Sequence, residues 1–221
     1  MKILPNGIAV IDGDTHISKW VEETGRLDHD QNTLPLLTRY IPKGGTVVDV
    51  GAFIGDHTLH YANCVGPTGS VVALEPNPLA FECLAHNMAA HKQVTCLNVG
   101  ASDISHTIGI EADANAGATY ANEDGAIPCL PLDSLYLAAC HFIKMDCEGF
   151  EVRALHGAFH TIRMHKPVML IEVNEGALKR QGKEPFDIFE ILDECGYKYR
   201  NIYPSQPMEG DQYDIIAWST R

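Results

Sequence analysis

The sequence predicts an α/β fold, in which a doubly wound, mostly parallel sheet is covered by helices on both faces. From residue 46 onward, short apolar segments typical of buried strands alternate with segments of helical periodicity. Strands such as residues 168–173 are apolar almost throughout, as expected for a sheet with no solvated face. The last connection, residues 206–212, is too short for a crossover helix, so the final strand is expected to pair antiparallel with its predecessor.

The individual elements follow from these patterns and from their turn signals. Helices are predicted near residues 56–64, 78–91, 150–165 and 185–195. Pro78 suits the first turn of its helix, where a missing N–H group is no loss. Strands are predicted at residues 46–50, 70–74, 94–98, 142–145, 168–173, 197–202 and 213–217.

Two further regions surround this alternating pattern. Residues 1–44 are predicted to be an appendage that packs on a catalytic domain of residues 45–221, with a short strand at 8–11 and helices at 16–23 and 33–40. Near residues 103–132 the sequence becomes polar and contains glycines, which indicates an inserted hairpin or flap. The chain is therefore read as one domain with an appendage.

The composition restricts the choice of partners. The chain has 221 residues, of which 29 are acidic and 16 basic, giving a formal charge of −13 that repels nucleic-acid backbones. The seven cysteines never form a C-x-x-C pair, which favours reduced, structural thiols. Neither a signal peptide nor a membrane span is apparent, so we expect a cytoplasmic protein. The oligomeric state cannot be inferred from these features.

The segment 47–57 has the pattern of a buried strand that ends in a turn with two glycines and opens a helix. Gly51 and Gly55 let a ligand approach the backbone closely, and Glu75 ends the next predicted strand. Since neighbouring parallel strands end at the same edge of a sheet, Glu75 is placed to accept hydrogen bonds from ribose hydroxyls. This arrangement predicts a site for an adenosine-type cofactor.

The spacing of the glycines favours a cofactor without a pyrophosphate. A dinucleotide site is typified by G-x-G-x-x-G, whereas here only Gly51 and Gly55 are present, with three residues between them. S-adenosylmethionine fits this pattern, with its amino-acid tail against the glycine turn and its ammonium group near Asp49. Its ribose would then reach Glu75.

Four motifs together resemble the FkbM family of class I S-adenosylmethionine-dependent methyltransferases. They are Asp-Val-Gly-Ala-Phe-Ile-Gly at 49–55, Leu-Asp-Ser-Leu at 132–135, Ile-Lys-Met-Asp-Cys-Glu-Gly-Phe-Glu at 143–151 and Leu-Ile-Glu-Val at 170–173. The resemblance covers about residues 45–175. It implies a Rossmann-like, seven-stranded sheet with an antiparallel last strand, and S-adenosylhomocysteine as the product. One departure is Phe53, where the family usually has a small polar residue, often asparagine.

The resemblance also implies which residues contact the cofactor. Asp49, Gly51 and Glu75 are implied as contacts, and the rest of the two motifs is included with them, namely Ala52, Phe53, Gly55 and Pro76. In such enzymes, residues that follow the third strand usually border the adenine. Ala101 and Asp103 are the candidates at that position here. For Asp103, an Asx turn or a helix cap is an equally good interpretation.

The residues that carry out methyl transfer are predicted at the carboxyl ends of the strands 142–145 and 168–173. Asp146 emerges at the same sheet edge as Gly51, where it is expected either to contact the sulfonium region of the cofactor or to orient an acceptor hydroxyl. Glu172 and Asn174 end the next strand. Asp146, Glu172 and His57 are the candidate catalytic residues for removing a proton from an acceptor hydroxyl. Glu151 is better explained as a helix cap or a surface residue. Asp146, Glu172 and Asn174 would suit Mg²⁺, but the family is not typically metal-dependent, so no metal site is favoured.

These inferences predict an S-adenosylmethionine-dependent methyltransferase. The family resemblance implies O-methylation of a hydroxyl on a sugar or sugar-bearing natural product, hence a small-molecule or glycan acceptor. An NAD-dependent oxidoreductase is an alternative, because Glu75 would serve a ribose there too, but the dinucleotide turn is missing. A non-catalytic module that binds S-adenosylmethionine is a second alternative.

Overall fold

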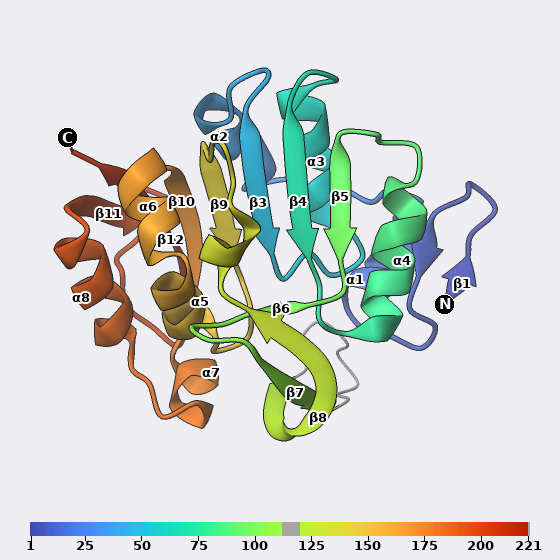
Figure 1. The fold of residues 1–221 in the computed structure, drawn as a ribbon. Coiled ribbons are helices and arrows are strands. Elements are labelled where there is room, and N and C mark those ends of the chain that lie inside the picture. Colours follow the sequence, from blue (N-terminus) through green and yellow to red (C-terminus); the bar gives the residue numbers. More distant parts are fainter. Residues whose placement is uncertain (112–119, 221) are drawn as a thin grey trace.

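The computed structural model describes residues 1–111 and 120–220 and has an α/β fold built on one large mixed sheet (Figure 1). The strand order is β11-β12-β10-β9-β3-β4-β5. Strands β10, β9, β3, β4 and β5 are mutually parallel, whereas β12 is antiparallel to both of its neighbours. The bounds are β3 Thr46–Val50, β4 Ser70–Leu74, β5 Val94–Leu97, β9 Phe142–Met145, β10 Val168–Asn174, β11 Tyr197–Asn201 and β12 Gln212–Ser219. The predicted parallel strands and the antiparallel final strand are thus confirmed.

Helices connect these strands and cover the sheet. Each of the four helices predicted beyond residue 45 is present, although the third is divided in two. The bounds are α2 Leu34–Leu37, α3 Asp56–Val65, α4 Pro78–Met88, α5 Glu151–Gly157, α6 Phe159–His165, α7 Glu175–Arg180 and α8 Pro185–Glu194. Two 3₁₀ helices are also present, η1 Thr38–Tyr40 and η3 Leu132–Leu135.

The strands of the sheet bury both of their faces, as the apolar sequence pattern predicts. In β3, Val48 and Val50 pack in a core with Leu155 of α5. Val47, which points to the opposite face, packs with Tyr61 of α3 in another core. The alternation of one strand between two cores fixes helices on each side of the sheet.

The division of the predicted helix 150–165 has a cause in the packing of the chain. Helix α5 ends at Gly157 and α6 begins at Phe159, with Ala158 between them at φ −106° and ψ 4°. A Cβ atom at Gly157 would lie 1.9 Å from the carbonyl oxygen of Ser102. This close approach of two segments distant in sequence favours a break that helical periodicity does not indicate.

The N-terminal segment packs beside the glycine turn that follows β3. It contains β1 (Lys2–Ile3), β2 (Ala9–Val10) and α1 (Ile17–Thr24). Asn87 of α4 holds β2 through hydrogen bonds to both the N–H and the carbonyl of Ala9, and the same amide donates to the carbonyl of Ile54 in the turn. One side chain therefore ties the N-terminal segment to the turn.

A separate three-stranded sheet of order β6-β8-β7 includes both strands of the predicted insertion, β7 and β8. Its strands are β6 Gly100–Ala101, β7 His106–Glu111 and β8 Tyr120–Leu130. β7 and β8 pair antiparallel, with a shift of register between Ile108 and Gly109. The tip of the insertion, residues 112–119, lies outside the described residues. Figure 1 places this small sheet below the carboxyl ends of β4 and β5.

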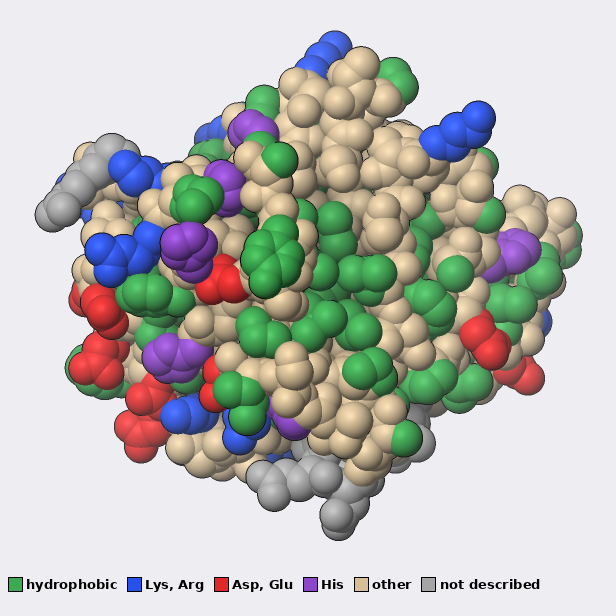
Figure 2. Space-filling model, in the orientation of Figure 1, with side chains coloured by type: hydrophobic (Ala, Val, Ile, Leu, Met, Phe, Trp, Pro, Cys, Tyr) green, Lys and Arg blue, Asp and Glu red, His purple; other side chains and the backbone are tan. Residues whose placement is uncertain are grey.

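Acidic and hydrophobic side chains occupy different parts of one face of the surface. On the face drawn in Figure 2, acidic side chains gather on the left, on the side of α7 and α8 in Figure 1, while hydrophobic side chains occupy much of the centre. Among the residues that the structure describes, every helix is too short or too polar to cross a bilayer.

Candidate cofactor and acceptor site

The glycine turn joins the ends of three strands. The N–H groups of Gly51 and Ala52 both donate to the carbonyl oxygen of Leu74, each at 3.0 Å, which fixes the turn to the end of β4. Gly51 has φ +77°, and a Cβ atom there would lie 1.7 Å from the carbonyl oxygen of Asp146, beyond β9. Only glycine fits, since it alone has no side-chain atom to place in that contact. Gly55, with φ +95°, opens helix α3.

Glu75 lies at the end of β4 and holds the turn from the other side. Its two carboxylate oxygens accept hydrogen bonds from the N–H groups of Phe53 and Asn77, both at 2.8 Å. The residue is only 6% exposed, and burial raises the pKa of its carboxyl group to about 7. A carboxylate offers about four acceptor positions, so capacity remains for ligand hydroxyls.

Phe53, the departure from the family pattern, has a left-handed backbone with φ +47°. This is a conformation that asparagine adopts more readily than phenylalanine. The backbone N–H of Phe53 nevertheless makes its bond to Glu75. Its side chain is buried in a cluster with Val10 and Val21 of the N-terminal segment and Leu84 of α4. The substitution therefore keeps the turn and adds apolar contact with the N-terminal segment.

Asp49 and Lys144 face each other in register across β3 and β9 beneath the turn. Asp49 is fully buried, and burial raises the pKa of its carboxyl group. Its Oδ2 accepts a 2.6 Å hydrogen bond from Thr58, whereas Oδ1 has no partner among the described residues. The Lys144 ammonium donates to the Gly51 carbonyl oxygen at 3.0 Å and lies 3.1 Å from Asp146 Oδ2.

Lys144 is a residue of the site that the sequence analysis did not single out. Burial opposes its charge, but the carboxylates of Asp146 and Asp49 outweigh that effect and hold the pKa of Lys144 above its usual value. The available signal was a single charged residue within the otherwise apolar strand Phe-Ile-Lys-Met.

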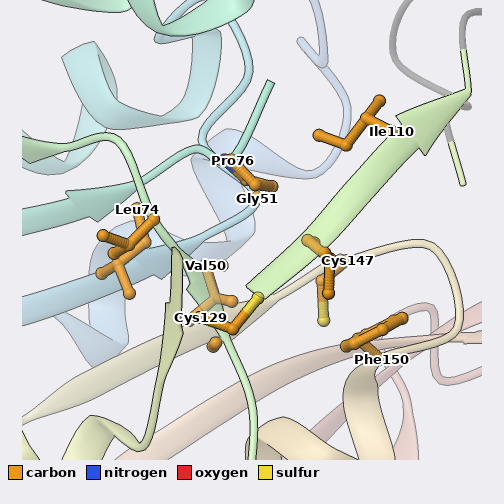
Figure 3. Close-up of a pocket in the computed structure, with 12 residues that line it drawn as sticks. Val50, Gly51, Leu74, Pro76, Ile110, Cys129, Cys147 and Phe150 are labelled. Carbon is orange, nitrogen blue, oxygen red and sulfur yellow. The ribbon is translucent and has the colours of Figure 1, made fainter. Parts of the chain in front are cut away.

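An apolar pocket with an empty volume of about 440 Å³, including its open mouth, lies beside the turn (Figure 3). Val50 and Leu74 lie on one side of it, and Ile110 and Phe150 on the other. Its twelve lining residues come from the strand ends, from the small sheet and from the start of α5: Val50, Gly51, Leu74, Pro76, Val99, Gly100, Ala101, Ile108, Ile110, Cys129, Cys147 and Phe150.

The pocket separates the two adenine candidates. Ala101 is buried and lines the pocket, whereas Asp103 is not among the lining residues. The Asp103 carboxylate accepts hydrogen bonds from the Ser102 hydroxyl and the Ile104 N–H. Its local bonding matches the Asx-turn interpretation. The contributions of the hairpin and of α5 were missed, because their place in the pocket depends on tertiary packing.

Three carboxylates gather at the ends of β9 and β10, and Asp146, Glu148 and Glu172 form what we call the acidic cluster. One oxygen from each lies within 4.8 Å of the others. Burial, reinforced by the charges of Asp146 and Glu148, raises the pKa of Glu172 to about 10. Burial likewise raises the pKa of Glu148 to about 7. Glu172 thus holds its proton at neutral pH, which counts against this candidate as a base.

Two polar residues near the acidic cluster accept hydrogen bonds from backbone N–H groups near the starts of α5 and α7. Glu151 is the first residue of α5 and is fully buried, and its carboxylate accepts the N–H groups of Cys147 and Gly149 in the turn before the helix. It therefore holds that turn, and it is neither a side-chain cap of α5 nor a surface residue. Asn174 caps α7 by accepting the Ala177 N–H at 3.0 Å. The structure therefore brings Glu148, rather than Asn174, together with Asp146 and Glu172.

His57, the third catalytic candidate, is the second residue of α3 and lies near Asp30 of the N-terminal segment. Its Nδ1 lies 3.1 Å from the Tyr61 hydroxyl, and its Nε2 lies 3.7 Å from the Asp30 carboxylate. Burial holds the pKa of His57 well below its usual value, so the ring is neutral at pH 7. Its immediate partners are Tyr61 and Asp30.

Comparisons with solved structures agree with the fold. The chain is similar to the methyltransferase FkbM from Methylobacillus flagellatus KT, with 19% identity, a TM-score of 0.55 and coverage of 78% of this chain but only 43% of that one. It is also similar to Aeropyrum pernix fibrillarin with bound S-adenosyl-L-methionine, with 12% identity, a TM-score of 0.54 and coverage of 87% and 76% of the two chains. At such identities the likeness establishes the fold alone.

A further similar structure is the O-methyltransferase from Bacillus cereus in complex with S-adenosylhomocysteine, with 13% identity, a TM-score of 0.53 and coverage of 85% and 79% of the two chains. No match was found among curated proteins. The model of the methyltransferase FkbM domain matches residues 49–199, about two thirds of the chain. This protein belongs to the FkbM methyltransferase family.

Proposed function

We propose that this methyltransferase uses S-adenosylmethionine to methylate a hydroxyl oxygen on a sugar or sugar-bearing natural product. The proposal of S-adenosylmethionine as the donor rests mainly on the position of Glu75, which lies between Leu74 and Pro76, two residues that line the apolar pocket. An apolar pocket beside a buried carboxylate with spare acceptor capacity suits an adenine and its ribose. Ala101 lies in the pocket's lining and is the proposed adenine contact.

The residues around the glycine turn fit the amino-acid tail of S-adenosylmethionine. Gly51 leaves no room for a side chain, and it belongs to the wall of the pocket. The partnerless Oδ1 atom of Asp49 is a fully buried acceptor, which suits an ammonium group. We therefore assign Asp49, Gly51, Ala52, Phe53 and Gly55 to the donor's amino-acid tail.

The acceptor is proposed to approach the acidic cluster. When bound, S-adenosylmethionine supplies a methyl group activated by its sulfonium. The acceptor hydroxyl has to lose its proton as its oxygen bonds to that methyl carbon. The Asp146 side chain, 39% exposed and at the end of β9, is the proposed proton acceptor. The preference for a hydroxyl rests on the family resemblance and agrees with a carboxylate-lined site.

Asp146→Asn is expected to separate donor binding from methyl transfer. Mass spectrometry of a panel of sugar hydroxyl compounds and matched amines should detect methylated hydroxyl compounds with the native protein. Loss of a general base should lower kcat by about 100-fold or more. The affinity for S-adenosylhomocysteine should change little, as measured by calorimetry.

Glu175→Gln is a matched control, because this glutamate begins α7, pairs with Lys179 and lies outside the acidic cluster. It should leave transfer unchanged. Methylation of the amines alone would contradict the proposed acceptor class. An undiminished kcat in Asp146→Asn would contradict the role of Asp146.

A further inference from the structure

The acidic cluster is built by two adjacent strands and the turn between one of them and α5. Asp146 follows β9, Glu148 lies two residues further in the turn, and Glu172 lies within β10. The ligand oxygens of these residues lie within 4.8 Å of one another. Like charges at this separation repel strongly in a partly buried site unless a proton or a cation lies between them.

An independent observation concerns the bonding of Glu172. This side chain is only 7% exposed, and its Oε1 accepts a hydrogen bond from the Gln212 amide. Its Oε2 is buried and has no hydrogen-bond partner among the described residues. Because a buried oxygen without a partner is costly, such an atom indicates a missing ligand.

The basic side chains near the acidic cluster are fewer than the acidic side chains. Lys144 lies 3.1 Å from Asp146, and Arg180 lies 3.9 Å from Glu148. Against these two cations stand the cluster itself and Asp214, which pairs with Glu172 in the register of β10 and β12. Asp214 and the buried Glu151 both act on Glu172 through their charges. The acidic side chains outnumber the basic ones, so the site holds either protons, as Glu172 does without a metal, or a further cation.

The size and chemistry of the cluster select a class of ion. Ligands on opposite sides of an ion are separated by twice the metal–oxygen distance, about 4.2 Å for Mg²⁺ and about 4.6–5.2 Å for Ca²⁺. Oxygens within 4.8 Å of one another can therefore surround one such ion. Ligand sets made only of carboxylates suit hard cations rather than zinc or copper.

We propose that Asp146, Glu148 and Glu172 bind one divalent cation of the Mg²⁺ or Ca²⁺ class. The ion takes the partnerless oxygen of Glu172 as a ligand and leaves coordination positions for water or an acceptor oxygen. The role of the ion in holding the acceptor rests on the proposed function, whereas its binding does not. From the sequence, a metal was not favoured because the FkbM family is not typically metal-dependent, and Asn174 rather than Glu148 was the third candidate ligand.

Calorimetric titration of the chelator-treated protein with MgCl₂ and with CaCl₂ tests the proposal. The native protein should bind one ion, and Glu172→Gln and Asp146→Asn should each weaken binding by about tenfold or more. Asp146 is partly exposed, so its asparagine variant is expected to fold. Glu175→Gln, which removes a charge of the same sign from outside the cluster, should bind the ion as the native protein does.

Saturable binding that is lost in both cluster variants supports the site. The absence of binding by the native protein, or equal binding by Glu172→Gln, overturns it. Titration of the same samples with S-adenosylhomocysteine keeps the two proposals apart. Donor binding without cation binding rejects the ion site alone, whereas cation binding without donor binding supports the ion site and rejects the proposed donor.

Discussion

Gly51→Ala should abolish binding of S-adenosylhomocysteine and lower the free energy of unfolding by about 3 kcal/mol or more. The new Cβ atom would lie 1.7 Å from the carbonyl oxygen of Asp146, a contact that requires the end of β9 to move away from the turn. The left-handed backbone, with φ +77°, adds strain for any residue with a side chain. Urea unfolding and calorimetry measure the two effects.

Gly196→Ala is the matched control for that experiment. Gly196 has φ +75°, but its Cβ atom would meet nothing within 4 Å, and the residue lies between α8 and β11. This variant should lose only about 1 kcal/mol of its free energy of unfolding, because alanine is strained in a left-handed backbone conformation, and it should keep donor binding. Equal losses in the two variants would show that the contact between Gly51 and Asp146 has no special importance.

Glu172→Gln is expected to stabilise the metal-free protein, increasingly so as the pH rises. The folded protein holds the Glu172 proton up to a pKa of about 10, whereas the unfolded chain releases it near the ordinary value of 4.5. Between these values the native protein loses stability with rising pH, by at most about 1.4 kcal/mol per pH unit. Glutamine has no such proton to lose and can still accept from Gln212.

Urea unfolding in the presence of a chelator, at about pH 5 and about pH 8, measures this difference. The advantage of Glu172→Gln should be small at the lower pH and amount to a few kcal/mol at the higher one. Glu175→Gln, at a partly exposed ion pair, should show no comparable trend. An advantage of Glu172→Gln that does not grow with pH would contradict the buried, protonated state of Glu172.

Much of the central sheet could be predicted because its strands are apolar runs of the correct length. The bounds of β3, β4 and β9 coincide with those expected from the sequence. Strand β1 was not foreseen, because its two residues are exposed and follow no periodicity. The short helix α7, capped by Asn174, also escaped prediction, since a capping side chain at a strand end resembles a ligand.

The candidate site was predictable only where local sequence determines it. The glycine turn and Glu75 follow from residues adjacent in the chain, and the structure brings them together. The hairpin residue Ile108 and Phe150, which immediately precedes α5, reach the pocket through packing between distant segments. Glu148 joins the acidic cluster because its backbone is left-handed, with φ +55°. A glutamate in the sequence does not predict this conformation.

The central claim is that the pocket and Glu75 together bind an adenosine-bearing donor. Calorimetry of the native protein with S-adenosylhomocysteine, its 2′-deoxy and 3′-deoxy analogues, and NAD tests this claim without altering the chain. We predict one site for S-adenosylhomocysteine, at least about tenfold weaker binding of a deoxy analogue, and little binding of NAD. Equal affinity for all three adenosyl compounds, or tighter binding of NAD, would contradict it.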